Sequence, residues 1–189
     1  MGLPPTSSIE HTIDLIPGAS FLNSSSYHLA PLEATKIEHK LAQLLAWEQI
    51  QPSPSPSAPL AFIIPKMDDY KWNIVTDYTT FHKDTIKNHY PLPKIEDLLD
   101  HLQGAYFFTN IDFTFGYHRA HMHTKNTWKT NFKANFGLFW WLVMPFGLTN
   151  ASTTFMRLIN DVFKSHLGKF LVIYLDDILV FIKYWVENL

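Results

Sequence analysis

Apolar residues along the chain are spaced in two ways, and each spacing predicts a different secondary structure. Apolar positions three to four residues apart predict helices, whereas short runs rich in β-branched and aromatic residues predict strands. The predicted helices span residues 31–49, 95–102 and 149–163. The predicted strands span residues 60–65, 72–76, 106–113, 116–122, 128–136 and 139–144.

Two further apolar runs, at residues 170–175 and 178–181, are separated by Asp176 and Asp177 alone. Each run has the length and the β-branched content of a strand, so together they predict a hairpin with two adjacent carboxylates in its tight connection. Predicted strands and helices alternate irregularly, and the predicted sheet is mainly antiparallel. The sequence therefore predicts an α+β protein.

A third acidic residue, Asp112, lies inside the predicted strand 106–113. Adjacent like charges are costly unless a cation lies between them and another acid, and carboxylate oxygens are ligands that suit Mg²⁺. Two such ions roughly 3.5–4 Å apart stabilise both the attacking and the leaving oxygen of a phosphoryl transfer. Aspartate is also a common turn residue, so the hairpin taken alone favours a structural turn. The three acids together indicate the chemistry of a polymerase.

Composition narrows the classes of protein that fit this pattern. The chain has 189 residues, of which 47% are hydrophobic, enough to bury a sizeable core. Cysteine is absent, which excludes disulfides and thiolate zinc sites and suits a reducing compartment. No apolar run reaches the roughly 18–20 residues of a membrane span, and the N-terminus lacks the features of a signal peptide. We therefore expect an intracellular protein of the cytoplasm or nucleus, with no membrane partner.

The charge balance predicts a weak electrostatic grip on nucleic acid. The formal net charge is −2, and Arg119 and Arg157 are the only arginines. Nucleic-acid-binding proteins usually carry a basic surface that neutralises phosphates. Lysine would have to supply nearly all phosphate contacts here, without the bidentate geometry of arginine.

Three histidines, His118, His121 and His123, lie close together in the sequence. If residues 116–122 form a strand, His121 and His123 share one face and His118 points away from them. Three-fold metal ligation then fails, and we expect these histidines to be structural or solvated.

Longer motifs connect the acidic hairpin to a known family. Residues 174–177 have the tyrosine–apolar–Asp–Asp form of reverse transcriptases, and residues 142–151, Leu-Val-Met-Pro-Phe-Gly-Leu-Thr-Asn-Ala, resemble the stretch that precedes it in gypsy-type LTR retrotransposon polyproteins. From about residue 2 to residue 181 the chain resembles the fingers and palm of that RNA-directed DNA polymerase. The other segments that carry the resemblance are 13–18, 90–95, 111–113 and 116–118, in the same order.

The resemblance implies one reverse transcriptase domain with the fold of a right-hand polymerase. It predicts an N-terminal arm over residues 1–27, mostly fingers with the start of the palm over 28–105, and the palm with the Asp-Asp hairpin over 106–189. The palm would be a mainly antiparallel sheet packed on helices. Since family polymerases continue past this hairpin, we expect a truncated domain whose thumb is absent.

The resemblance also implies a set of site residues. Asp112 and Asp176 would ligate two Mg²⁺ (or Mn²⁺) ions, and Asp177 would complete the cluster. Tyr117 would pack beneath the incoming sugar and exclude a 2′-hydroxyl, while Phe146 would touch the sugar and base. The remaining implied contacts are Lys66 and the backbone of Phe115 and Gly116 to the triphosphate, and Leu175 to the primer end.

Two departures from the family pattern leave two functions open. Asn73 and Thr79 stand where the family usually has arginines. The first hypothesis is a nucleotidyltransferase that adds dNTPs to a primer on an RNA or DNA template, with other domains of a retroelement polyprotein as further candidate partners. The alternative is a catalytically inactive retroelement remnant, acting as a folded fragment or a weak nucleic-acid-binding module.

Overall fold

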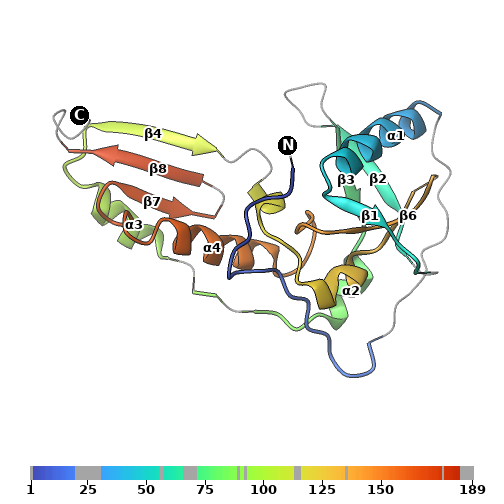
Figure 1. Ribbon diagram of the computed structural model, residues 1–189. Coiled ribbons are helices and arrows are strands. Elements are labelled where there is room, and N and C mark those ends of the chain that lie inside the picture. Colours follow the sequence, from blue (N-terminus) through green and yellow to red (C-terminus); the bar gives the residue numbers. More distant parts are fainter. Residues whose placement is uncertain are drawn as a thin grey trace. The chain divides into compact units, whose positions relative to one another are not determined.

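A computed structural model describes residues 2–19, 31–55, 58–65, 72–88, 90–91, 93–112, 116–134, 136–175 and 177–183 (Figure 1). Contacts along the chain divide it into two compact units, each assembled from two separate segments. Unit 1 comprises Met1–Lys87 and Tyr117–Ala151, and unit 2 comprises Asn88–Gly116 and Ser152–Leu189. Among the described residues, no helix is both long and apolar enough to cross a membrane.

Unit 1 is built around helix α1 and two small antiparallel sheets. One sheet has the strand order β1-β6-β5 and the other pairs β2 with β3. The elements are α1 (Pro31–Ala46), β1 (Ile50–Pro52), β2 (Ala61–Pro65), β3 (Trp72–Thr76), α2 (Thr79–Asp84), the 3₁₀ helices η1 (Gly116–Arg119) and η2 (Thr124–Thr130), β5 (Phe132–Ala134) and β6 (Gly137–Trp141).

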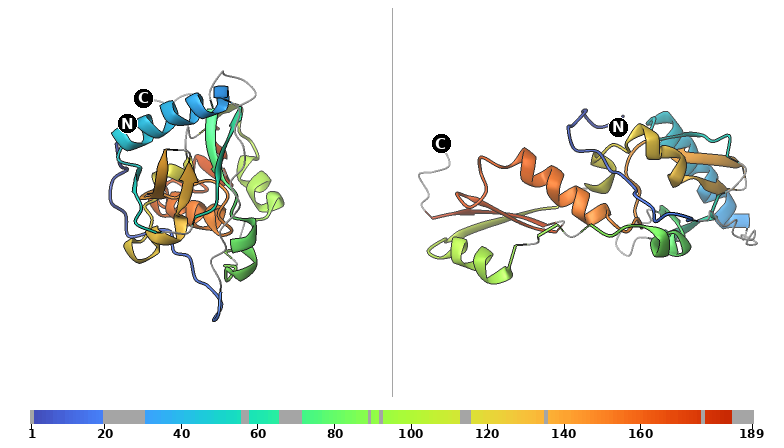
Figure 2. Two further views of the ribbon diagram at one scale, coloured as in Figure 1. Left: turned by 90° about the vertical axis from the view of Figure 1, so that its right-hand side faces the viewer. Right: turned by 90° about the horizontal axis from the view of Figure 1, so that it is seen from below.

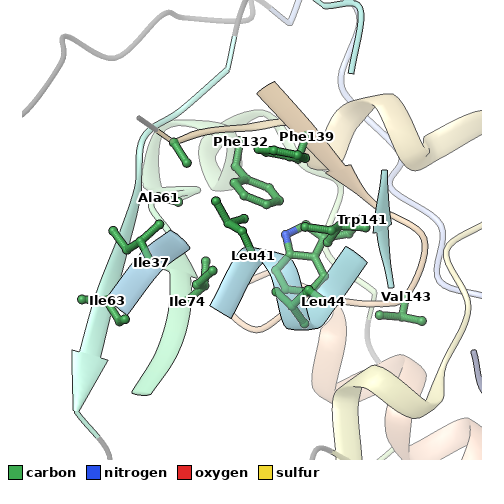
Figure 3. Packing of buried hydrophobic residues seen from close by; sticks show 12 residues of the cluster. Ile37, Leu41, Leu44, Ala61, Ile63, Ile74, Phe132, Phe139, Trp141 and Val143 are labelled. Carbon is green, nitrogen blue, oxygen red and sulfur yellow. The ribbon is translucent and has the colours of Figure 1, made fainter. Parts of the chain in front are cut away.

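The core of unit 1 lies between α1 and these sheets. Ile37, Leu41 and Leu44 recur at helical spacing on α1, and all three side chains are buried. They face strand residues that include Phe132 and Trp141, whose ring centroids are 5.5 Å apart (Figure 3). The other buried members of this cluster are Ile50, Ala61, Ile63, Ile74, Ala134, Phe139 and Val143.

Residues 2–19 form an extended strap within unit 1. Backbone hydrogen bonds connect this strap to other segments of the unit. The backbone N–H of His11 donates to His121 O at 2.8 Å, and the N–H of His123 donates to His11 O at 3.0 Å. Further along, Ile16 N–H donates to Asp84 O at 2.9 Å. The backbone of this segment therefore bonds two parts of the chain that are far apart in sequence.

Unit 2 is a three-stranded antiparallel sheet of order β4-β8-β7 with two helices. Its elements are α3 (Ile95–Leu102), β4 (Phe107–Asp112), α4 (Ala151–Val162), β7 (Leu171–Tyr174) and β8 (Asp177–Ile182). Figures 1 and 2 show β4, β8 and β7 next to one another, with α3 and α4 beside them. Buried residues of β7, β8 and α4 include Ile173, Phe181 and Phe155.

The predicted helices, the predicted strands 60–65 and 72–76 and the predicted Asp-Asp hairpin are confirmed, with ends shifted by a few residues. The predicted strand 116–122 is wrong, because its first half is the 3₁₀ helix η1. Of the predicted strand 128–136, residues 128–130 belong to η2 instead, while residues 132–134 form β5. Threonine hydroxyl groups help to explain why η2 is helical: Thr127 Oγ1 donates to Thr124 O, and Thr130 Oγ1 donates to Thr127 O. Such local bonds favour a tight helical turn despite strand-like composition.

Candidate active site

The register of the unit 2 sheet brings two of the predicted acids to facing positions. The Cα of Asp112, at the end of β4, pairs with the Cα of Asp177, at the start of β8. Facing positions in an antiparallel pair have Cβ atoms about 4.5–5.5 Å apart. Asp177 is exposed, whereas the side chain of Asp112 and the whole of Asp176 lie outside the described residues.

The connection between β7 and β8 is as short as a hairpin allows. Tyr174 pairs with Asp177, so Leu175 and Asp176 alone make the turn. Leu175 has a φ of 55°, in the left-handed region that two-residue hairpin turns require and that Gly or Asn usually fills. A leucine there costs roughly 1–2 kcal/mol. Strain of this kind is found preferentially at functional sites.

The predicted nucleotide contacts Tyr117 and Phe146 lie together in unit 1. Their ring centroids are 5.0 Å apart at an interplanar angle of 67°, an edge-to-face contact. Tyr117 belongs to η1, and Phe146 lies in the loop after β6; both side chains are partly buried. Of the other predicted contacts, Gly116 is buried at the start of η1 and Leu175 is exposed, while Lys66 and Phe115 lie outside the described residues.

A buried histidine supports the aromatic pair. His118 is only 8% exposed, and its ring centroid lies 5.3 Å from Phe146 and 5.1 Å from Trp141. Burial lowers the pKa of His118 to about 4, with a smaller contribution from the charge of Lys40. The imidazole is therefore neutral at physiological pH and packs as an aromatic ring.

Backbone hydrogen bonds hold together the two segments that carry this pair. Met144 N–H donates to Ala120 O at 2.8 Å, and Met122 N–H donates to Leu142 O at 2.9 Å. The strap binds the other side of the same segment through His11. Tyr117 and Phe146 thus extend from two paired segments, which limits their relative movement.

One contact to this site comes from an element that sequence reasoning missed. His82, on α2, donates from Nε2 to the carbonyl oxygen of Gly147, the residue after Phe146. Helix α2 has six residues, too few to show helical periodicity. The sequence therefore held no signal for this role of His82.

The three clustered histidines have separate partners. His121 Nε2 lies 2.8 Å from Pro4 O, and His123 Nδ1 accepts from the Lys125 N–H. His118 packs against aromatic rings. Within the described part of the chain, no three His, Asp or Glu residues are grouped to hold a metal ion. The expectation of structural roles for His118 and His121 fits these contacts, although the strand on which it rested is a 3₁₀ helix.

The two positions that depart from the family pattern have contacts of their own. Thr79 donates from its hydroxyl and its backbone N–H to Asp77 Oδ1 at the start of α2. These hydrogen bonds, the hydroxyl's first, hold the pKa of Asp77 below its usual range. Asn73 lies on β3 opposite Ile64.

The fold is that of solved polymerases. The foamy viral protease-reverse transcriptase in complex with RNA/DNA hybrid aligns over 95% of this chain and 24% of its own length, with a TM-score of 0.77 and 20% identity. A second structure of that protein, in complex with dsDNA, gives a TM-score of 0.75 over 90% of this chain and 35% of its own length, at 22% identity. The predicted α+β class and fingers-and-palm fold are thereby confirmed.

The family follows from the sequence comparisons. Residues 64–187 match the model of the family described as "Reverse transcriptase (RNA-dependent DNA polymerase)", and the chain belongs to this family of nucleotidyltransferases. The retrovirus-related Pol polyprotein from transposon 297 of Drosophila melanogaster is 32% identical over 97% of this chain and 18% of its own length. The Pol polyprotein from transposon gypsy of the same organism is 35% identical over 77% of this chain and 14% of its own length. The predicted gypsy-type resemblance is confirmed.

A shorter relative also matches. The RNA-directed DNA polymerase homolog of Oenothera berteroana is 44% identical over 108 residues, which are 57% of this chain and 76% of that protein. By contrast, the chain spans less than a fifth of the length of the transposon polyproteins quoted above.

Proposed function

We propose that this chain is the fingers and palm of an RNA-directed DNA polymerase, which transfers a nucleotidyl group from a dNTP to a primer 3′-hydroxyl on an RNA or DNA template. The primer oxygen forms a bond to the α-phosphorus, and pyrophosphate leaves. The observation that supports this most is the register that pairs Asp112 with Asp177 in a chain of the reverse transcriptase family. The foamy viral relative is bound to RNA/DNA hybrid, which supports nucleic acid as the partner.

Asp112, Asp176 and Asp177 are the proposed metal-binding residues. Carboxylates are the hard oxygen ligands that Mg²⁺ and Mn²⁺ prefer, and the facing positions of Asp112 and Asp177 fit such a donor set. When bound, two such ions would neutralise triphosphate charge and lower the pKa of the primer hydroxyl. The strained turn at Leu175 places the start of β8, with Asp177, directly after a two-residue connection.

The remaining residues are proposed to position the nucleotide and primer. Tyr117 packs beneath the sugar and excludes a 2′-hydroxyl, with Phe146 against the sugar and base. Leu175 approaches the primer end. Lys66 and the backbone N–H groups of Phe115 and Gly116 bind the triphosphate. The edge-to-face packing of Tyr117 on Phe146 supports a joint role of these two rings.

Binding to the primer-template is expected to be weak and sensitive to salt, because the net charge is −2 and two arginines are available. Other domains of a retroelement polyprotein are proposed as partners, and the cytoplasm or nucleus as the location. Nothing in the described residues or in the relatives favours the alternative of an inactive remnant.

Primer extension on an RNA template tests this proposal. At low salt, millimolar Mg²⁺ and high protein, we expect addition of at least one dNTP, abolished by Asp176→Asn. Asp161→Asn, on an exposed position of α4 in the same unit, is the matched control and should retain the activity. Activity that survives Asp176→Asn, or a wild-type chain with none, would overturn the proposal.

A second measurement does not depend on turnover. Ions that bind the folded state alone raise thermal stability by linkage. Millimolar Mg²⁺ or Mn²⁺ should therefore raise the Tm of the wild type and of Asp161→Asn, but raise that of Asp176→Asn much less. A Tm that does not respond to either ion in any of the three proteins would contradict the metal assignment.

A further inference from the structure

We infer that His82 is a positioning residue for nucleotide selection, acting through the Gly147 carbonyl on Phe146. This inference rests on the proposed function, because it assigns His82 to the site that Tyr117 and Phe146 form. His82 bonds the backbone of the residue next to Phe146, so its effect on a nucleotide is indirect.

The hydrogen bond determines which atom carries the proton. His82 Nε2 lies 2.5 Å from Gly147 O, and a carbonyl can only accept, so Nε2 is protonated. Asp77 lies near enough for the charge of His82 to contribute to its lowered pKa, after the hydrogen bonds from Thr79. His82 is therefore oriented between the start of α2 and the loop that carries Phe146.

The loop needs an external contact because its backbone is unusual at this point. Gly147 has a φ of +91°, which residues with a side chain rarely adopt. A Cβ at Gly147 would lie 3.6 Å from Thr76 O, an ordinary contact, so φ rather than space requires glycine. A glycine is free to leave this conformation, and the hydrogen bond from His82 opposes that movement.

Phe146 is thus restrained from three directions. His82 holds the following peptide, Tyr117 packs edge-to-face at 5.0 Å, and the buried His118 packs at 5.3 Å. All of these residues belong to unit 1. Loss of the His82 contact would let Phe146 shift against Tyr117, and the proposed exclusion of a 2′-hydroxyl depends on that contact.

The test compares three substitutions on α2. His82→Leu removes the donor, His82→Gln keeps an N–H donor at similar reach, and Lys83→Leu is a matched control at an exposed position that the site does not use. For each variant, the selectivity ratio is measured, which is the kcat/KM of dNTP incorporation divided by the kcat/KM of incorporation of the corresponding rNTP. We expect His82→Leu to lower this ratio about two- to tenfold, the range of one neutral hydrogen bond. His82→Gln should restore most of it, and Lys83→Leu should leave it unchanged.

A spectroscopic readout tests the contact without activity. Labelling with ¹³C-glycine and ¹⁵N-leucine marks three Gly–Leu pairs, 2–3, 137–138 and 147–148. In His82→Leu the 147–148 signal should shift while the other two stay in place, and in His82→Gln it should remain near the wild-type position. His82→Asn, whose amide is too short to reach, repeats the test if the leucine variant does not fold.

The outcomes separate this inference from the proposed function. A wild-type chain that incorporates no nucleotide overturns the proposed function. An active chain whose selectivity ratio is unchanged in His82→Leu overturns the inference alone. An unshifted 147–148 signal in His82→Leu also overturns the inference, because the contact would then not hold the loop.

Discussion

Unit 1 packs a helix and two sheets around a buried core, whereas in unit 2 a helix and an edge strand leave their apolar side chains exposed or half-buried. In unit 1, α1 and two sheets enclose large side chains such as Phe132 and Trp141. In unit 2, α3 has no buried residue although leucines recur on one of its faces. The described side chains of β4, residues 107–111, are exposed throughout, even though that strand carries Phe107 and Phe108.

The two parts of the proposed site therefore lie in units that bury their apolar side chains to different extents. The acids are proposed to act at the end of β4, an edge strand with few buried contacts, whereas the Tyr117–Phe146 pair rests on the well-packed unit. Exposed apolar groups on an edge strand and an amphipathic helix contribute little to stability and favour association. Substitutions of equal size should therefore have unequal effects in the two units.

The largest expected difference comes from the same substitution at two leucines. Leu41 on α1 is 3% exposed and Leu99 on α3 is 58% exposed. Leu41→Ala should lower the free energy of unfolding by about 2–5 kcal/mol, through lost burial and a cavity. Leu99→Ala should change it by no more than about 0.5 kcal/mol. Urea unfolding measures both, and equal losses would show that unit 2 buries α3 as firmly as unit 1 buries α1.

Acid should act on unit 1 through its buried histidines. Burial lowers the pKa of both His11 and His118 to about 4. The unfolded histidines bind protons near pH 6.5, so the unfolded state holds more protons between these values and stability falls as the pH drops from about 6.5 to 4. Each histidine contributes at most about 3.4 kcal/mol at the acid end of this window.

One variant tests this prediction by removing the imidazole of His118, and a second variant serves as its control. His118→Phe keeps an aromatic ring between Phe146 and Trp141 and should flatten the acid loss measured by urea unfolding between pH 7 and 4. His39→Phe, at an exposed position on α1, should leave the loss intact. A wild-type stability that does not change over this window would mean that both histidines are hydrated in the folded state.

The sequence predicts best those features that depend on local periodicity. The α3 prediction, residues 95–102, matches the helix in the structure residue for residue, and both hairpins fall where strand-like runs flank polar residues. The motif around Tyr174 to Asp177 identified the family. The pairing of Asp112 with Asp177 follows once those two strands are adjacent, but adjacency is a tertiary feature that the motif alone implies only by resemblance.

Two kinds of feature were not predictable: a tight turn held by its own side chains, and contacts between segments that are far apart in sequence. The 3₁₀ helix η2 carries Trp128 and several threonines, a composition typical of strands, and its threonine side chains bond within their own turn. The strap uses backbone groups of His11, which carry no sequence signal. His82 meets Gly147 across 65 residues of sequence, from a helix too short to recognise.

The smallest expected effect concerns association through unit 2. Phe108 on β4 and Phe136 in the turn before β6 of unit 1 are each 52% exposed, so the same substitution at both removes a similar apolar side chain. Phe108→Lys should reduce association at tens of micromolar more than Phe136→Lys, because a lysine on an exposed edge strand opposes edge-to-edge pairing. Light scattering or sedimentation velocity measures the mean particle mass of the wild type and of both variants. A wild-type chain that is monomeric at these concentrations, or a Phe136→Lys variant that matches Phe108→Lys, would show that the exposed surface of β4 does not drive association.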